Sequence, residues 1–390
     1  MTLSFSDARA AVLREVTARP QRETVSLAAC MGRVLAQDVL ADRDFPALDR
    51  SVRDGYAVHA QDLPGPLPVS GTIRAGDAPA TLHPGTAVEI MTGAPIPFGA
   101  DAVVMIEHVV QEGQRITHAP VAPGTHISRR AEEASQGQVL LSKGTRLDPS
   151  HIAVLAACGH AEVSVFHRPS VTILATGDEL VAIERAPLPH QIRNSNAHAL
   201  AAQVTRAGGL PRLLPVAPDD RDRTRALIEE GLHDNLLLLS GGVSAGKFDF
   251  VEGALADLGA TFHFDRAAIQ PGAPIVFGHC RQRPFFGLPG NPVSTLVTFE
   301  IFARAALDLL AGAGETALPT AYGRLTQPFR HKPGLTRFLP ALVDSQGGLT
   351  PVRWRGSSDM AAVGRANAFL IADADREAWD TGDFLPLLWK

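Results

Sequence analysis

The sequence predicts a multidomain α/β protein. We expect a three-layer α/β/α domain with a mostly parallel sheet, an N-terminal β-rich module and a small C-terminal β barrel. Three observations support this prediction. Apolar strand-like runs alternate with helix-like segments from Ser170 to Gly312. Short β runs separated by Gly and Pro fill roughly residues 69–139, and short strand patterns return after about Ala313.

The central region has the alternation that is typical of parallel sheets, because each strand returns to the sheet through a helix. Its expected strands span residues 171–175, 212–216, 235–240, 261–265, 274–278 and 284–287. Its expected helices span residues 195–207, 222–232, 249–258 and 292–311. Four consecutive leucines at 236–239, bounded by turn residues, fit a strand that is buried on both faces.

Helices are also expected outside this region. One amphipathic helix should span residues 6–18 with Ser6 as its cap, a short one should run from Leu27 to Met31 before Gly32, and another should span 149–159. The expected domains are a helical and linking domain (1–45 and 140–168), an inserted β-rich module (46–139), the α/β/α domain (169–312) and the barrel (313–390).

Composition excludes several classes of protein. The chain has 390 residues, 45% hydrophobic and 20% charged, which is typical of a globular protein with several domains. A formal net charge of −5 gives no reason to expect nucleic acid as a partner. No apolar run is long enough to cross a bilayer, and the N-terminus has no pattern of a secretory signal. Cys30, Cys158 and Cys280 match no zinc spacing, which favours buried thiols in the cytoplasm.

Three expected strands end in turn-rich loops that carry polar groups. The leucine strand leads into Ser240-Gly241-Gly242, the strand at 171–175 leads into Thr176-Gly177-Asp178-Glu179, and the strand at 284–287 leads into LPGNPVS. Each loop alone is most simply an ordinary turn. Together they predict a shared pocket, because exit loops of parallel strands converge at one sheet edge.

Carboxylates follow the expected strands. Glu179, Asp219 and Asp249 can converge at the carboxyl edge, where few hard oxygen ligands on separate loops suit Mg²⁺. Capping of the next helix explains Asp219 and Asp220 equally well, and it is also an alternative for Asp249. Asp178 can simply hydrogen-bond the turn. Glu179 and Asp249 are the better predicted ligands.

The segment Gly241–Lys247 has the spacing of a nucleotide-binding phosphate loop, G-x-x-x-x-G-K. The next residue is Phe248, so the hydroxyl that would bind magnesium is missing. We therefore do not expect a triphosphatase. The backbone amides of 241–244 can still hold an anion or phosphate without that chemistry.

Six ordered motifs resemble the molybdopterin molybdenumtransferase family, which comprises bacterial MoeA proteins and the E domain of gephyrin. The resemblance covers essentially the whole chain. The motifs are DGYAV (54–58), MTGAPIP (91–97), ATGDEL (175–180), SGGVSAGKFD (240–249), QPGAP (270–274) and GLPGNPVS (287–294). The resemblance implies an enzyme that converts adenylylated molybdopterin and molybdate, with Mg²⁺, to molybdenum cofactor and AMP.

The resemblance also implies roles for individual residues in a site shared by two subunits of a homodimer. Asp54 and Thr92 would reach the ligand in the partner's pocket, and Glu179, Asp219 and Asp249 would form the acidic metal-binding and catalytic group. The implied substrate-binding residues are Gly241, Gly242, Ser244, Pro289, Gly290, Asn291, Pro292 and Ser294. Each has a structural alternative: Asp54 and Thr92 as turn residues, the prolines as loop formers, and Ser294 as a helix cap.

The sequence departs from the family where many relatives carry KPGKP. Gln270 and Ala273 replace the two lysines, so two cations that could hold an oxyanion are absent. Arg266 is the nearest cation that remains in the sequence, and we expect it and Gln270 to contact the substrate. Arg337 and Arg365 fall near positions where relatives place anion-contacting residues.

Two other functions remain as alternatives. A scaffold or binding protein of the same fold would not need its carboxylates, yet Asp54, Glu179, Asp219 and Asp249 are all present. An adenylyltransferase acting one step earlier would need only the α/β domain. The implied further partners are that upstream enzyme and the molybdoenzymes that receive the cofactor.

Overall fold

The computed structural model describes residues 2–18, 20–242, 250–314, 316, 318 and 320–390. The chain forms two compact units. Unit 1 comprises Met1–Ala36, Lys143–Asp148 and Val163–Lys390, and unit 2 comprises Gln37–Ser142 and Pro149–Glu162. Within the described residues, no helix has both the length and the apolar character needed to span a bilayer. Cys30, Cys158 and Cys280 are free and buried, as predicted.

Unit 1 contains a six-stranded sheet in the order β17-β14-β18-β23-β22-β19. Its strands are β14 (Ser170–Ala175), β17 (Leu210–Leu213), β18 (Leu236–Ser240), β19 (Thr261–Phe264), β22 (Val276–Cys280) and β23 (Arg283–Leu288). The first four strands of the order run parallel, and β22 and β19 add an antiparallel edge. The predicted mostly parallel sheet is confirmed.

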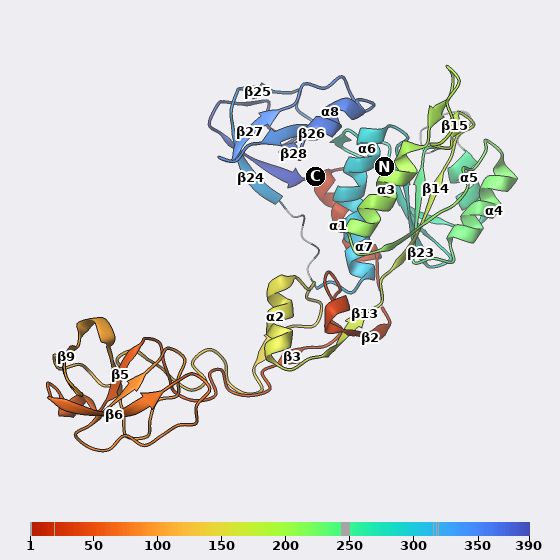
Figure 1. Cartoon of the computed structure of the whole chain (residues 1–390). Coiled ribbons are helices and arrows are strands. Elements are labelled where there is room, and N and C mark those ends of the chain that lie inside the picture. Colours follow the sequence, from red (N-terminus) through yellow and green to blue (C-terminus); the bar gives the residue numbers. More distant parts are fainter. Residues whose placement is uncertain (1, 19, 243–249, 315, 317, 319) are drawn as a thin grey trace. The chain divides into compact units, whose positions relative to one another are not determined.

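Helices cover both faces of this sheet, which confirms the three layers (Figure 1). On one face lie α1 (Phe5–Glu15), α3 (Ser195–Arg206), α6 (Pro292–Thr298) and α7 (Arg304–Leu310); on the other lie α4 (Arg221–Gly231) and α5 (Phe250–Asp257). The strand residues alternate between the two cores. Ile173 and Leu238 pack with the first group, whereas Leu174 and Leu237 pack with the second.

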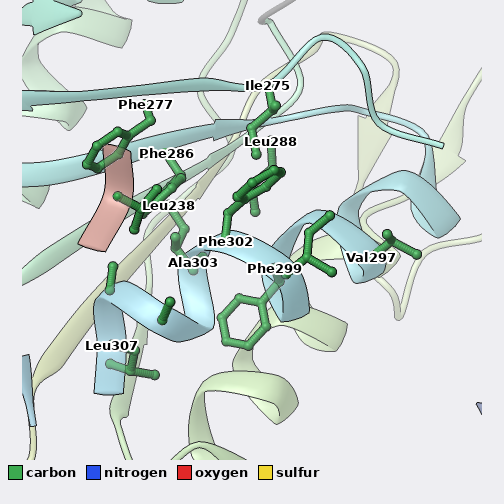
Figure 2. Packing of buried hydrophobic residues seen from close by; sticks show 14 of the residues in the cluster. Leu238, Ile275, Phe277, Phe286, Leu288, Val297, Phe299, Phe302, Ala303 and Leu307 are labelled. Carbon is green, nitrogen blue, oxygen red and sulfur yellow. The ribbon is translucent and has the colours of Figure 1, made fainter. Parts of the chain in front are cut away.

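The predicted helix at 292–311 is continuous but contains a π-helical segment, η4 (Phe299–Ala303), between α6 and α7. One residue of this segment, Phe302, is fully buried. The centroid of its ring lies 5.8 Å from the ring centroid of Phe5 and 6.0 Å from that of Phe264. Figure 2 shows Phe302 pointing toward the sheet residues Leu238 and Leu288. The helix is thereby packed against one face of the sheet.

We expect Phe302→Ala to lower the free energy of unfolding by about 3–5 kcal/mol, because the substitution removes a fully buried ring and leaves a cavity. Chemical denaturation followed by circular dichroism measures the change. The exposed Phe384 on the barrel offers a matched control, since Phe384→Ala removes the same ring without opening a cavity. A loss below about 1 kcal/mol for Phe302→Ala would contradict the packing described here.

The C-terminal part of unit 1 is a closed β barrel, as predicted. Its sheet has the order β21-β26-β27-β24-β30-β28, and an additional pairing of β26 with β28 closes it. The strands are β21 (Ile269–Gln270), β24 (Thr320–Leu325), β26 (Thr336–Val343), β27 (Gly348–Pro351), β28 (Ala368–Ala372) and β30 (Phe384–Trp389). A separate pair comprises β25 (Phe329–Arg330) and β29 (Ala378–Trp379). The short helix α8 (Met360–Arg365) was not predicted.

The N-terminal prediction needs two corrections. The oxygen of Ser4, not of Ser6, accepts a hydrogen bond from the N–H of Asp7 and caps α1, because the helix begins one residue earlier than expected. The segment predicted as Leu27–Met31 is the short 3₁₀ helix η1 (Leu27–Ala29). The other strands here are β1 (Thr2–Leu3), β2 (Arg22–Ser26), β13 (Glu162–Phe166) and β20 (Arg266–Ala267).

Unit 2 is built on a six-stranded sheet in the order β8-β5-β7-β6-β10-β9. Its strands are β5 (Gly55–Val58), β6 (Leu67–Ile73), β7 (Ala87–Ile90), β8 (Ala102–Met105), β9 (Val110–Glu112) and β10 (Arg115–Thr117). The remaining elements are β3 (Val39–Leu40), β4 (Arg50–Ser51), β11 (Ile127–Ser128), β12 (Val139–Leu141), the 3₁₀ helices η2 (Ala60–Asp62) and η3 (Ile106–His108), and α2 (Pro149–Ala157).

Candidate functional site

The exit loops of the four parallel strands meet at one edge of the sheet. The N–H of Thr176 donates to the carbonyl of Ser240 at 3.1 Å, and the N–H of Gly241 donates to the carbonyl of Leu288 at 3.2 Å. Thr176 also forms a β-bridge with Ala217 after β17. The loops that carry the predicted site residues are therefore joined to one another by backbone hydrogen bonds.

A cavity of about 320 Å³, called here the first chamber, opens between these loops. It is lined by Ala175, Thr176, Glu179, Leu180, Ile192, Arg193, Asn194, Ser195, Asn196, Ser240, Gly241, Gly290, Asn291, Pro292 and Ser358. The structure thus brings together Glu179, Gly241, Gly290, Asn291 and Pro292, which the sequence placed in one pocket. Within the part of the chain that the structure describes, Glu179 and Arg193 are its charged lining residues.

Glu179 has a local environment that depends on Gly177. The φ angle of Gly177 is +135°, and a Cβ at this position would collide with the carboxylate of Glu179. The carbonyl of Glu179 accepts a hydrogen bond of 2.9 Å from the N–H of Ile192, next to the parallel pair β15 (Leu180–Val181) and β16 (Ile192–Arg193). The backbone thus holds the exposed side chain of Glu179 at the chamber.

Asp219 and Asp220 have separate roles in the structure. Asp220 caps α4, because its Oδ1 accepts the N–H of Arg223 at 2.9 Å. The N–H of Asp219 donates to Oδ1 of Asp178 at 3.1 Å, so Asp178 joins the loops after β14 and β17. The carboxylate of Asp219 is exposed, and Asp219 is not among the lining residues of the first chamber.

The predicted metal ligands can be compared with the structure only in part. Asp249, like Ser244 and most of the Gly241–Lys247 segment, lies outside the described residues. Among the residues that are described, no three His, Cys, Asp or Glu side chains are grouped so that they could hold a metal ion. Glu179 is the predicted ligand that lines the chamber.

A second chamber of about 410 Å³ lies on the other side of the Pro289–Pro292 loop. Its lining comprises Ile269, Gln270, Pro271, Gly272, Ala273, Pro274, Pro289, Asn291, Ser294, Leu335, Trp354, Gly356 and Ser357. None of these described residues is charged. The predicted substrate-binding residues Gln270, Pro289 and Ser294 lie here, and Asn291 lines both chambers.

The arginines considered as anion ligands lie elsewhere in unit 1. Arg266 is exposed on β20, where it pairs with Thr2, and it lines neither chamber. Arg337 is the cross-strand neighbour of Gln270, and within the described chain its buried Nε has no hydrogen-bond partner. Arg365 is exposed at the end of α8. The lysines missing at Gln270 and Ala273 thus have no charged substitute in the second chamber's described lining.

The loop between the chambers ends at the N-terminus of α6, whose N-cap residue makes no side-chain capping hydrogen bond. Asn291 is the N-cap of α6 and Pro292 follows at the first helical position, yet the Asn291 side chain makes no capping hydrogen bond. Its amide group thus remains available to a ligand. Ser294 is not the cap, because it lies inside the first turn of α6, where it is buried beside the second chamber.

Asp54 and Thr92, both in unit 2, are in direct contact. Oδ1 of Asp54 accepts the N–H of Thr92 at 2.6 Å and its hydroxyl at 2.8 Å. These bonds, the backbone one first, hold the pKa of Asp54 below its usual value, since they favour the ionised carboxylate. Both side chains are exposed at the ends of neighbouring turns, so a charged group is held on the surface of unit 2.

We expect Thr92→Val to raise the pKa of Asp54 toward its ordinary value, because the hydroxyl donor is lost while the backbone donor remains. A lowered pKa means that the ionised form stabilises the fold above the unfolded-state pKa, and this contribution disappears as the pH falls through the folded-state pKa. Carboxyl NMR titration of the two proteins measures the shift. An unchanged Asp54 pKa in the variant would contradict the bond to the hydroxyl.

Sequence reasoning missed the residues at the start of α3. Asn194 caps this helix through its Oδ1, which accepts the N–H of Ala197 at 3.2 Å. Asn196 instead donates from Nδ2 to Oγ of Ser240 at 3.0 Å and to the carbonyl of Gly290 at 2.8 Å. The signal was present in the sequence, since a helix start needs one cap and Arg193-Asn194-Ser195-Asn196 offers three candidates.

Comparison with known proteins agrees with the resemblance of the motifs. Residues 3–159 match the family model of the MoeA N-terminal region (domain I and II), and residues 172–309 match a probable molybdopterin binding domain. Residues 322–387 match the MoeA C-terminal region (domain IV). A molybdopterin molybdenumtransferase of Bacillus subtilis is 37% identical over 94% of this chain and 90% of its own length. The chain belongs to the molybdopterin molybdenumtransferase family.

Other members of the molybdopterin molybdenumtransferase family match over similar lengths. The one from Synechococcus elongatus is 38% identical over 89% of both chains. Among solved structures, the chain is similar to a molybdopterin biosynthesis moeA protein from Pyrococcus horikoshii OT3, with a TM-score of 0.84, 29% identity and full coverage of both chains. The similarity to this solved structure therefore covers the β-rich module, the α/β/α domain and the barrel of the chain.

Proposed function

We propose that this protein is a molybdopterin molybdenumtransferase, which inserts molybdate into adenylylated molybdopterin and releases AMP. Family membership supports the reaction, and the first chamber is the observation that carries it to this chain. The chamber combines a carboxylate, Glu179, with a cation, Arg193, at the convergence of four strand exits. A phosphoanhydride that is cleaved at this place would meet both charged groups and the glycine-rich backbone of Gly241 and Gly290.

The residues around the first chamber fit an anionic ligand. The 12-residue helix α3 begins at Ser195 and Asn196, which both line the chamber, so its first N–H groups and the positive end of its dipole lie at the cavity. Arg193 adds a full positive charge beside them. These groups would bind the substrate's phosphates and stabilise the negative charge that AMP carries when it leaves.

Mg²⁺ is part of the proposal. This ion needs only one or two protein carboxylates, because waters and substrate phosphate complete its coordination. Glu179 supplies one carboxylate at the chamber, and we propose Asp249 as the second and Asp219 as a contributor from the adjacent loop. When bound, the ion would neutralise phosphate charge. Glu179 would bind and orient it, while Arg193 and the start of α3 hold the phosphates.

We further propose a homodimer, located in the cytoplasm, in which Asp54 and Thr92 of one subunit complete the pocket of the other. The hydrogen bonds of Thr92 favour the ionised form of Asp54, and its side chain is exposed, as that of a residue that contacts a ligand outside its own module would have to be. The upstream adenylyltransferase and the receiving molybdoenzymes are proposed as transient partners.

A second candidate is a non-catalytic molybdopterin-binding or scaffold protein of the same fold. The second chamber favours it, because none of its described lining residues is charged, so an oxyanion there would meet no charged lining residue. The presence of Glu179 and Arg193 in the first chamber favours the enzyme. An adenylyltransferase acting one step earlier fits less well, because the chain also matches the MoeA N- and C-terminal regions.

The experiment that tests the proposed function measures whether molybdenum is incorporated into the pterin product. The purified protein is incubated with adenylylated molybdopterin, Mg²⁺ and molybdate, and the pterin product is separated and analysed for molybdenum by mass spectrometry. We expect metal and pterin to co-migrate in equal amounts. Pterin that remains bound to the protein, still adenylylated and free of molybdenum, would instead establish the binding protein.

We expect Gln270→Lys combined with Ala273→Lys to tighten molybdate binding by about ten- to a hundredfold, because the change adds two charged donors to a neutral chamber. Calorimetric titration at fixed salt measures the affinity. A matched control adds the same charge at the exposed turn residues Ser345 and Gln346, again as lysines. If both double variants bind molybdate as the wild type does, the oxyanion does not occupy the second chamber.

A further inference from the structure

We infer that Asn196 is a positioning residue for the proposed transfer reaction: it holds the Gly290–Asn291 peptide at the first chamber and thereby sets the direction of the groups that Asn291 presents. The inference rests on the proposed function, which it extends by one residue. It follows from the hydrogen bonds of Asn196 and from the lack of a local role for its side chain.

Asn196 is not explained by the helix in which it lies. Asn194 already caps α3, and Asn196 is the second residue of the helix, so its side chain is not needed as the cap. Both hydrogen bonds of the Asn196 side chain go to distant parts of the chain, namely to Ser240 at the end of β18 and to Gly290 after β23. One amide nitrogen thus joins three loops at the chamber.

Each of the two acceptors is itself fixed in place. Ser240 is buried, with 3% of its surface exposed, and its carbonyl accepts the N–H of Thr176 at 3.1 Å. Gly290 lies against Gly241, since a Cβ on Gly290 would be 3.7 Å from the Cα of Gly241. Asn196 therefore connects the Gly290 loop to the rigid end of the central strand.

The bond to Gly290 has a consequence for Asn291. In a trans peptide the C=O and N–H groups point in opposite directions, so holding the Gly290 carbonyl also fixes the direction of the Asn291 N–H. Asn291 lines both chambers, and its side chain makes no capping bond. Asn196 thus determines how the residue between the two chambers faces a substrate that extends across them.

The loop has other anchors on either side of the Gly290–Asn291 peptide, and one of them is the N–H of Thr295, which donates to the carbonyl of Asn291 at 3.0 Å. The hydroxyl of Thr295 donates to the carbonyl of Pro289 at 2.5 Å, and the N–H of Val293 donates to the carbonyl of Ser357 at 3.0 Å. Without Asn196, the peptide between these anchors can rotate. The ligand would then meet a loop that is no longer pre-organised, and a shift of about 1 Å can cost about a hundredfold in rate.

The test compares three variants. Asn196→Ala removes the side chain, and Asn196→Asp keeps its shape but removes the N–H donors. His198→Ala is the matched control, because His198 is exposed on the same helix and lines neither chamber. Amide hydrogen exchange of the segment 287–293 is measured on each full-length protein without ligand, and AMP release is measured with substrate.

We expect both Asn196 variants to exchange faster at Val293, whose N–H donates to the carbonyl of Ser357 at the end of this loop, and to lose about 10- to 100-fold in kcat/KM, while His198→Ala changes neither. The inference is overturned if exchange is unchanged, or if exchange rises while kcat/KM stays at the wild-type value. A wild type that releases no AMP would refute the proposed function instead, and the exchange measurement would still decide whether Asn196 holds the loop.

Discussion

Replacing Glu179 by glutamine is expected to lower the rate of AMP release by about a hundredfold or more. The substitution keeps the size and shape of the side chain but removes the negative charge of the acid that lines the first chamber. The backbone around it is held by bonds that the side chain does not make, including the one from the N–H of Ile192. The fold should therefore be unaffected, and the loss should appear in catalysis alone.

Glu184→Gln is the matched control for this prediction. Glu184 is an exposed acid that follows β15, five residues after Glu179, and it lines neither chamber. Steady-state rates of both variants are measured at several Mg²⁺ concentrations, since a role in holding the ion predicts that extra Mg²⁺ partly restores Glu179→Gln. Equal rates for Glu179→Gln and the wild type would remove Glu179 from the catalytic group.

The second large effect is expected in mixed dimers. An Asp54→Ala chain and an Asp249→Ala chain should each be inactive alone, because every pocket of either homodimer lacks one carboxylate. If Asp54 serves the neighbouring pocket, each mixed dimer regains one intact pocket, and random mixing should restore roughly a quarter of the wild-type rate. The rate is measured on mixtures in which chain exchange has been verified by two different affinity tags.

A matched mixture distinguishes a shared pocket from a general stabilising effect of mixing. Glu179→Gln and Asp249→Ala would both change the pocket of the same α/β/α domain, so their mixed dimers contain no intact pocket and should stay inactive. Activity in both mixtures would contradict the assignment of Glu179 and Asp249 to one subunit's pocket. No recovery in verified mixed dimers of the first pair would contradict the shared site.

The central domain could be predicted because its physical signals are strong. A strand that is buried on both faces has an unbroken run of apolar residues in the sequence, as at Leu236–Leu239. The structure has a parallel strand at this position. Boundaries were less accurate. Ser4 and Ser6 are both residue types that cap helices, and the structure uses Ser4.

The candidate site was predictable where it depends on topology. Glu179, Gly241 and Gly290 come together because parallel strands end at one edge of the sheet. Asn196 was not predicted, since its role depends on contacts with residues 44 and 94 positions away in the chain. Arg266 was predicted to contact the substrate because it is close to Gln270 in the sequence. In the structure it lies on β20, where it pairs with Thr2, and it lines neither chamber.

The most direct measurement is the release of AMP from adenylylated molybdopterin by the purified protein with Mg²⁺, with and without molybdate, beside an Asp249→Ala variant. A transferase should release AMP in the presence of molybdate, and the variant should lose this activity. A wild type that binds the substrate but releases no AMP under either condition would contradict the proposed reaction and support a binding protein with this fold.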